Sequence, residues 1–394
     1  MGVPDEALAL HERFRGKVEV KSKVPLKDRR DLTLAYTPGV AEPCRRISSN
    51  PELSYKYTSK WNLVAVVSDG TAVLGLGDIG PEAAMPVMEG KAILFKEFGG
   101  VDAFPICLRT KDAEKIVETV KLLEPTFGGI NLEDISAPRC FEIEERLKQE
   151  LSIPVFHDDQ HGAAIVVLAA LGNALKVVGK KMGKIRIVIS GAGAAGMATG
   201  KFLLSAGARD IILCDTRGAI YEGREEGMNK HKEEFAQKSN RERKAGSLAD
   251  MMDGADVFVG LSAGGIVSEG MAGSMNEDAI VFAMANPVPE ILPGLAKKAG
   301  AKIVGTGRSD YPNQINNLLA FPGVFRGALD VRARDISEGM KLAASKAIGG
   351  MVAEGLLSAE NILPSALDRN VAKGVASAVA RQAKEEGLAR EWPR

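Results

Sequence analysis

The chain has 394 residues, of which 45% are apolar and 26% charged, and its 51 basic residues balance its 51 acidic residues. This composition excludes a largely disordered or fibrous protein. The balanced charge gives no indication of nucleic acid or an anionic membrane as a partner. Because hydrophobic cores stop growing at about 250 to 300 residues, the length predicts two domains.

The chain also lacks the usual signals of export or membrane insertion. Its first residues contain neither a secretory pattern nor a lipidation signal. The most apolar run, residues 163–175, is shorter than the roughly 20 residues of a membrane span, so we expect a buried helix. The four cysteines are scattered without a CxxC pair: Cys44, Cys107, Cys140 and Cys214. We expect a cytoplasmic protein with reduced thiols.

From Trp61 onward, short runs rich in β-branched residues alternate with helical patterns. The expected strands are residues 62–67, 101–108, 127–132 and 153–156. The expected helices between them are residues 81–98, 112–123 and 138–151. Such alternation predicts parallel βαβ units with helices covering the sheet. We assign residues 1–160 to an N-terminal α/β domain.

A long apolar helix at 161–178 leads into a second α/β series. Its expected strands are residues 184–190, 210–214, 256–260, 279–284 and 302–305. Two amphipathic helices follow, at 337–354 and 368–385, and we expect them to pack back on a domain or on a partner subunit. We assign residues 161–394 to this second domain.

A glycine-rich turn follows the first strand of the second series and opens a helix. It reads Gly191, Ala192, Gly193, Ala194, Ala195 and Gly196. In a Rossmann unit the first glycine makes the turn, the second lets a pyrophosphate approach, and the third lets helix and strand pack closely. Asp215 lies 19 residues after Gly196, near the ribose-binding position about 20 residues on. The sequence therefore predicts NAD or NADP binding here.

Two pairs of acidic residues follow strands of the first domain, Glu133-Asp134 and Asp158-Asp159. Open α/β sheets bind ligands at the carboxyl ends of their strands. Carboxylates gathered at that edge suit Mg²⁺ or Mn²⁺. The alternative is that Asp134 and Asp159 are helix N-caps, where Asp is favoured. Two equivalent pairs beside a dinucleotide domain favour the metal.

Lys91 falls within the apolar stripe of the helix expected at 81–98. The pattern is compatible with two positions of the Lys91 side chain. The side chain either extends to solvent along its aliphatic stem, or it lies in a dry site. In a dry site, desolvation and a nearby cation would lower its pKa toward neutrality and make it a general base.

Taken together, these segments resemble the malic enzymes, in the smaller form found in bacteria and archaea. The matching stretches, in the family's order, are residues 35–41, 67–70, 75–80, 88–91, 129–134, 156–162, 191–196, 285–287, 316–317 and 321–323. They extend over most of the chain. The resemblance implies oxidative decarboxylation of malate to pyruvate with reduction of NAD or NADP.

The resemblance also implies roles for the acids and the lysine. Glu133, Asp134 and Asp159 would bind the divalent metal, and Asp158 would support the base. Lys91 would bind substrate and take the proton of the C2 hydroxyl as hydride leaves.

Three further positions acquire roles only through the resemblance. Tyr36, which by itself would be taken as structural, would protonate C3 of the enolate. Asn286 and Asn317 would contact the substrate and the nicotinamide end of the cofactor. One departure is visible: larger malic enzymes carry a substrate-binding arginine where this chain has Thr71-Ala72-Val73. The resemblance therefore does not show how the second carboxylate of malate is held.

The choice of dinucleotide depends on Asp215 and Arg217. A carboxylate at Asp215 accepts hydrogen bonds from the ribose of NAD and repels the 2′-phosphate of NADP. Arg217 could pair with that phosphate. We expect use of both cofactors with a modest preference for NAD.

Two other classes of protein fit parts of the pattern. One is a metal-free two-domain dehydrogenase acting on another small acid, with Lys91 as its base. The other is a non-catalytic regulator that senses NAD(P). The dehydrogenase would need no carboxylate cluster, and the regulator has no use for Lys91, Tyr36 and four acids in one crevice. We expect a homodimer, with the segment before Trp61 and the C-terminal helices at its interface.

Overall fold

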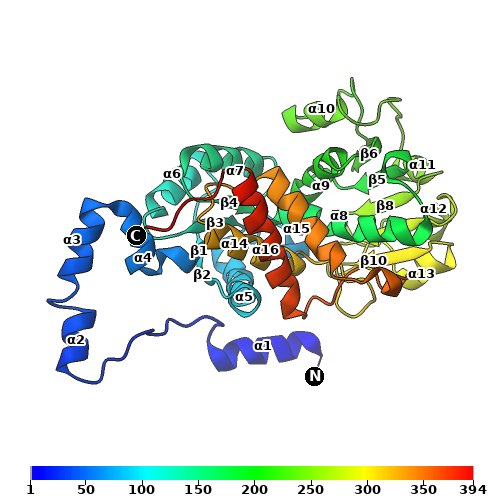
Figure 1. Ribbon diagram of the computed structural model, residues 1–394. Helices are drawn as coiled ribbons and strands as arrows, with labels where there is room; N and C mark the ends of the chain where they lie inside the picture. The colour runs from blue at the N-terminus through cyan, green and yellow to red at the C-terminus, as the bar shows by residue number, and fades with distance from the viewer. Residues whose placement is uncertain (1, 394) are drawn as a thin grey trace.

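The computed structural model describes residues 2–393, which contain two parallel sheets with helices on their faces (Figure 1). The first sheet has four strands and the second has six. The two-domain α/β architecture expected from the sequence is confirmed.

The first sheet has the strand order β2-β1-β3-β4, and all its strands are parallel. Its strands are β1 (Leu63–Ser68), β2 (Asp102–Cys107), β3 (Gly129–Leu132) and β4 (Val155–His157). The helices that alternate with them are α5 (Pro81–Gly99), α6 (Ala113–Leu123) and α7 (Arg139–Glu150). Each expected strand and helix of this domain is present, with ends that differ by a few residues.

Strand β1 is buried on both of its faces, as parallel strands usually are. Val64 and Val66 pack in the same core cluster as Phe95 of α5. Ala65 and Val67, which point the other way, pack in the cluster that holds the apolar side of α6. This double burial explains why the strand is a continuous apolar run and shows no polar alternation.

The second sheet has the order β10-β9-β8-β5-β6-β7. Its strands are β5 (Arg186–Ser190), β6 (Asp210–Asp215), β7 (Gly218–Ala219), β8 (Val257–Gly260), β9 (Ile280–Ala283) and β10 (Ile303–Thr306). All are parallel except β7, a two-residue strand that the sequence pattern did not predict. The chain runs to opposite sides of β5, with β6 on one side and β8 on the other. Such a switch point opens a crevice at the carboxyl ends of the strands.

Helix α8 (Asp158–Val178) joins the two units and contacts both α9 (Ala194–Ser205) and α15 (Glu338–Gly350). Its length and composition would be enough to cross a membrane, but most of its apolar part is buried inside the protein. The expectation of a buried helix at this position is confirmed. The remaining short helices are α4 (Ser54–Tyr57), α10 (Lys230–Ala236), α11 (Leu248–Met252), α12 (Glu269–Gly273) and α13 (Pro293–Lys298).

The C-terminal helices pack back on the body, as expected. Helix α16 (Arg369–Glu385) lies against α15 and α14 (Phe321–Asp330), and both α14 and α16 contact α5 of the first unit. The second half of the chain therefore covers one face of the first sheet.

The N-terminal segment runs along the outside of the molecule as an arm (Figure 1). It contains α1 (Val3–Phe14), α2 (Arg29–Ala35) and α3 (Ala41–Ser49), and none of these helices has a buried residue. The arm exposes many large apolar side chains: Val3, Leu8, Leu10, Phe14, Val20, Val24, Leu26, Leu32, Leu34 and Val40. We call residues 2–50 the N-terminal arm.

Candidate active site

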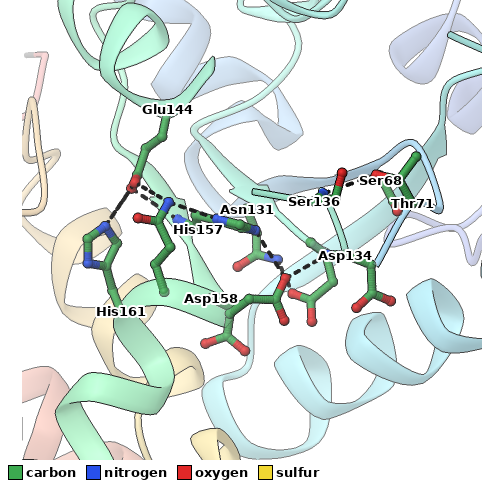
Figure 2. A network of polar contacts seen from close by, with 12 residues as sticks. Ser68, Thr71, Asn131, Asp134, Ser136, Glu144, His157, Asp158 and His161 are labelled. Atoms are coloured by element: carbon green, nitrogen blue, oxygen red, sulfur yellow. Dashed lines mark hydrogen bonds and ion pairs between the residues drawn. The ribbon is translucent and has the colours of Figure 1, made fainter. Parts of the chain in front are cut away.

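The two acid pairs lie next to each other because their strands are neighbours. Strands β3 and β4 are paired in register up to Leu132 and His157, and each acid pair begins one residue later. Oxygens of Glu133, Asp134 and Asp159 lie within 4.8 Å of one another. Figure 2 shows Asp134 and Asp158 close together at this edge of the sheet. The expectation that both pairs face one site is confirmed.

Neither Asp134 nor Asp159 caps a helix. Helix α7 begins five residues after Asp134 with Pro138 as its N-cap, and the N-cap of α8 is His157. Asp159 instead accepts hydrogen bonds on its Oδ2 from the backbone N–H of Asp134 at 2.7 Å and from the ring of His157 at 3.0 Å. The N-cap alternative is therefore wrong for both residues.

The acid cluster has the properties of a cation site. Oδ2 of Asp134 is buried and has no hydrogen-bond partner. Burial, together with the charge of Asp159, raises the pKa of Asp134 to about 8. Burial also raises the pKa of Glu133 well above its usual value, although Lys91 opposes this. Three crowded carboxylates with an unused oxygen suit Mg²⁺ or Mn²⁺, which prefer oxygen ligands.

Lys91 lies inside the site and does not extend to solvent. It is 8% exposed, and its Nζ lies 2.5 Å from Oδ2 of Asp158 and 2.9 Å from Oε1 of Glu133. The ammonium also lies over the ring of Phe321, 4.2 Å from its centre. The pKa of Lys91 is not lowered, in contrast to the expectation for a lysine in a dry site. Burial does lower the pKa of Lys91, but Asp158 and Glu133 outweigh burial and raise it.

Asn317 reaches the same carboxylate from the second half of the chain. It begins the short 3-10 helix η5 (Asn317–Leu319), and its Nδ2 donates to Oδ2 of Asp158. Oδ1 of Asp158 is buried without a partner. Gly162 allows this fit, because a Cβ there would lie 2.0 Å from Oδ1 of Asp158. The structure therefore brings Lys91, Asp158 and Asn317 together.

The glycine-rich loop has the geometry that the sequence predicted. Gly191 has φ +109°, and a Cβ there would lie 2.3 Å from the carbonyl oxygen of Leu261. A Cβ on Gly196 would lie 1.7 Å from the carbonyl oxygen of Gly191, so helix α9 can approach the strand only with glycine here. Around Gly193 a Cβ would meet nothing within 4 Å. The loop thus leaves open space beside the free amides at the start of α9, where a pyrophosphate would bind.

Asp215 ends β6, as expected, but two basic residues that sequence reasoning missed surround it. Arg224 and Lys232 both pair with its carboxylate, Lys232 at 2.7 Å. Burial raises the pKa of Asp215, but these partners outweigh it and lower the pKa to about 2. Arg217 donates its backbone N–H to Asp215, while its guanidinium pairs with Glu226. No sequence signal marks Arg224, in the loop after β7, or Lys232, in the first turn of α10.

Asn286 is exposed just after β9, where the two units touch. A Cβ on Gly75, in the first unit, would lie 2.6 Å from the carbonyl oxygen of Asn286. Its contact with the nicotinamide remains a prediction.

Tyr36 is not brought to the acid cluster within one chain. It follows α2 in the N-terminal arm and is 66% exposed. Figure 1 shows α2 well apart from β3 and β4.

The segment Thr71-Ala72-Val73, which departs from the larger malic enzymes, is held by an arginine of α7. Thr71 is buried, and its Oγ1 accepts hydrogen bonds from the backbone of Ser136 and from Arg139, both at 3.0 Å. Arg139 also pairs with Asp69 at 2.9 Å. Sequence reasoning did not single out Arg139.

A Rossmann unit whose crevice faces a carboxylate cluster with a buried lysine defines a two-domain NAD(P)-binding oxidoreductase. Residues 15–148 match the family model described as "Malic enzyme, N-terminal domain", and residues 160–293 and 300–384 match "Malic enzyme, NAD binding domain". The chain therefore belongs to the malic enzyme family, as its sequence motifs suggested. This membership sets aside both the metal-free dehydrogenase and the non-catalytic regulator.

Similar proteins support the assignment over the whole length. The chain is 62% identical to a bifunctional malic/malolactic enzyme of Bacillus subtilis, covering 99% of this chain and 95% of that protein. It is 58% identical to an NAD-dependent malic enzyme of Geobacillus stearothermophilus, covering 99% and 81%. The solved malic enzyme of Pyrococcus horikoshii superposes with a TM-score of 0.94 at 53% identity, covering 100% and 93%.

Proposed function

We propose that this protein oxidises malate at C2 and decarboxylates the product to pyruvate and CO₂, with reduction of NAD or NADP. The observation that carries the proposal is the position of Lys91. Its amine lies between Asp158 and Glu133, so one basic group contacts both a buried acid and the proposed cation site.

Lys91 is proposed to hold the proton that leaves the C2 hydroxyl of malate. Asp158 fixes the lysine amine from one side, and Asn317 in turn donates to Asp158. This arrangement keeps the amine in one place, but a general base must also have lost its own proton. A cation held by Glu133 would favour that loss, because it would offset the negative charge that raises the pKa of Lys91. The ring of Phe321 lies against another side of the amine.

The acids Glu133, Asp134 and Asp159 are proposed to hold Mg²⁺ or Mn²⁺. When bound, such an ion acts as a Lewis acid on the keto acid and stabilises the negative charge that develops as CO₂ leaves. The unpaired oxygen of Asp134 and the raised pKa of this residue support the assignment.

The cofactor is proposed to lie in the crevice of the second sheet. The loop from Gly191 to Gly196, including Ala192, Ala194 and Ala195, would bind the pyrophosphate through backbone amides. Asp215 and Arg217 would face the adenosine ribose. Asn286 would contact the nicotinamide end, beside the first unit.

Assays of the purified protein with each of the two cofactors test the proposal. Malate is supplied with NAD or NADP and Mn²⁺, and reduced cofactor, CO₂, pyruvate and lactate are measured. Equal amounts of reduced cofactor, CO₂ and pyruvate are expected. Because the Bacillus subtilis relative is named malic/malolactic, lactate without net reduced cofactor would indicate the second activity. Reduced cofactor without CO₂ would contradict the proposal.

The active form is proposed to be a homodimer in which the N-terminal arm of each chain serves the other. Two observations support this. The arm exposes a long series of apolar side chains that a partner would cover, a pattern that marks interaction surfaces. Tyr36 lies on that arm, away from the acids of its own chain, so a second copy is the natural source of the proton donor.

Mixing two inactive variants tests the exchange of Tyr36. In a mixed dimer of Lys91→Ala and Tyr36→Phe chains, one site receives both an intact lysine and an intact tyrosine if the tyrosine comes from the partner. Unfolding and refolding the two variants together should then restore activity that neither has alone. If Tyr36 serves its own chain, no site in the mixed dimer is intact and no activity returns.

We also propose a cytoplasmic location. All four cysteines are free, with Cys140 and Cys214 buried. Such thiols fit a reducing compartment.

A further inference from the structure

A buried glutamate lies behind the acid cluster and is not part of it. Glu144 is on the inner side of α7, and its carboxylate accepts hydrogen bonds from three residues. The ring of His161 donates at 2.8 Å, the amide of Gln160 at 2.9 Å and the backbone N–H of His157 at 3.2 Å. Figure 2 shows Glu144 with His161 and His157 around it.

Glu144 is held as a charged acceptor. Burial raises the pKa of its carboxyl, but His161 outweighs burial and lowers the pKa to about 2. An ionised carboxylate can accept hydrogen bonds but cannot donate them. Every neighbour of Glu144 must therefore turn an N–H toward it.

This requirement fixes the orientation of Gln160. The nitrogen of its amide lies 2.9 Å from Glu144 and 2.8 Å from Nδ1 of His157. Turning the amide over would place its oxygen against the carboxylate of Glu144. One N–H of Gln160 thus points at Glu144, and the other points at Nδ1 of His157, which must accept it.

The proton of the His157 ring is then on the far nitrogen. With Nδ1 accepting, Nε2 carries the hydrogen and donates to Oδ2 of Asp159 at 3.0 Å. The backbone N–H of Asp134 donates to the same oxygen. Both hydrogen bonds fall on Oδ2, which leaves Oδ1 of Asp159 for a cation.

A doubly protonated ring is the alternative for His157. A second ring proton would sit on Nδ1 and face the NH₂ group of Gln160. The neutral ring with hydrogen on Nε2 is the form that fits these contacts.

The orientation of the His161 ring, on the other side of Glu144, is fixed in the same way. Nζ of Lys341, on α15, lies 3.2 Å from Nδ1 of His161. A lysine ammonium only donates, so Nδ1 of His161 accepts and its Nε2–H points at Glu144. Glu144, Gln160, His161 and Lys341 also line a cavity of about 520 Å³, whose lining does not include the three proposed metal ligands.

We infer that Glu144 is a positioning residue for the metal site. Through Gln160 it holds His157 as the Nε2–H tautomer, and His157 in turn holds the carboxylate of Asp159 in the position from which it would bind the cation. The inference deepens the proposed function, since it assumes that Asp159 is a metal ligand. Removing a residue that orients a metal ligand through hydrogen bonds typically weakens metal binding about 10- to 100-fold.

The first test measures Mn²⁺ binding by electron paramagnetic resonance, without turnover. Glu144→Gln keeps the shape of the side chain but releases the orientation of Gln160, so Mn²⁺ should bind about tenfold or more weakly while NAD(P) binding is unchanged. Glu145→Gln is the matched control, because this neighbouring glutamate is exposed. Gln160→Met removes the link but leaves Glu144 paired with His161, and it should weaken Mn²⁺ binding similarly if Glu144→Gln fails to fold. Unchanged Mn²⁺ affinity in a folded variant of either kind overturns the inference.

The second test observes the tautomer itself. The chain has only four histidines, so ¹⁵N NMR of histidine-labelled protein with Mg²⁺ can assign the His157 ring as the signals that are missing from a His157→Asn variant. Hydrogen on Nε2 alone is expected in the wild type, and a mixture of tautomers in Glu144→Gln. Hydrogen on Nδ1 in the wild type overturns the inference. Because neither readout requires malate oxidation, a failure of the proposed activity is distinguishable from a failure of this inference.

Discussion

Lys91 of α5 contacts Asp158 at the start of α8, with 2.5 Å between the amine and the carboxylate. The two residues are 67 positions apart and both are buried. An ammonium and a carboxylate in such a setting bind each other strongly, so either one left alone would be costly. The pair therefore fixes the lysine where substrate would meet it.

Lys91→Ala is expected to lower kcat by roughly 10² to 10⁴, the usual effect of losing a general base. NAD(P) binding, measured by fluorescence titration, should change little because the glycine-rich loop is in the other unit. Lys96→Ala is the control, since Lys96 lies on the same helix but is exposed and pairs with Asp102. Near-normal turnover of Lys91→Ala would leave the lysine with only a structural role.

Removing the divalent ion should abolish activity, and Mn²⁺ or Mg²⁺ should restore it, because the keto acid must be polarised for CO₂ to leave. Asp159→Asn is expected to weaken metal binding while NAD(P) affinity stays the same. Calorimetric titration with each ligand separates the two effects. Full malate oxidation in excess chelator would refute the metal assignment.

Metal affinity should rise with pH and level off near pH 8. The pKa of Asp134 is about 8 in the folded protein, compared with an ordinary value of 3.8. Between these values the folded protein holds a proton that the unfolded chain has released, so the folded state loses stability as the pH rises. A bound cation displaces that proton, so affinity should increase about tenfold per pH unit for each proton displaced. Titrating Mn²⁺ at several pH values checks this, and the slope should become smaller in Asp134→Asn.

Asp215→Ser should shift cofactor preference toward NADP by about tenfold or more, or about 1.4 kcal/mol. The substitution removes the charge that repels a 2′-phosphate and frees Arg224 and Lys232 to bind that phosphate. The ratio of kcat/KM for the two cofactors measures the shift. Asp210→Ser, at the other end of β6, should leave the ratio unchanged. A constant ratio in Asp215→Ser would mean that this residue does not face the ribose.

The regular elements could be predicted because local signals determine them. Strands such as β1 are short apolar runs because both of their faces are covered, and helix α5 begins at a proline and ends at a glycine. The meeting of the two acid pairs also followed from the sequence, since residues that follow neighbouring parallel strands must lie at one edge. These features need no knowledge of distant contacts.

Other features depend on contacts between distant residues and could not be predicted. The pKa of Lys91 is raised by Asp158 and Glu133, which no helical projection includes. Lys232, on α10, reaches Asp215 across the segment that follows β7, and Glu144 meets Gln160 only once α7 packs against β4. The position of the N-terminal arm, which carries Tyr36, could not be predicted either, because a surface segment has no apolar pattern that shows where it packs.

Helix α8 starts at the two acids, Asp158 and Asp159, and runs for 21 residues into the interior. The peptide dipoles of such a helix add up to about half a positive charge at its first turn. The backbone of α8 thus helps to stabilise the negative charge of these carboxylates. Dissolved ions screen charges mainly at exposed surfaces, and Asp158 in this first turn is fully buried. We therefore expect the ionisation of Asp158 to change little with ionic strength.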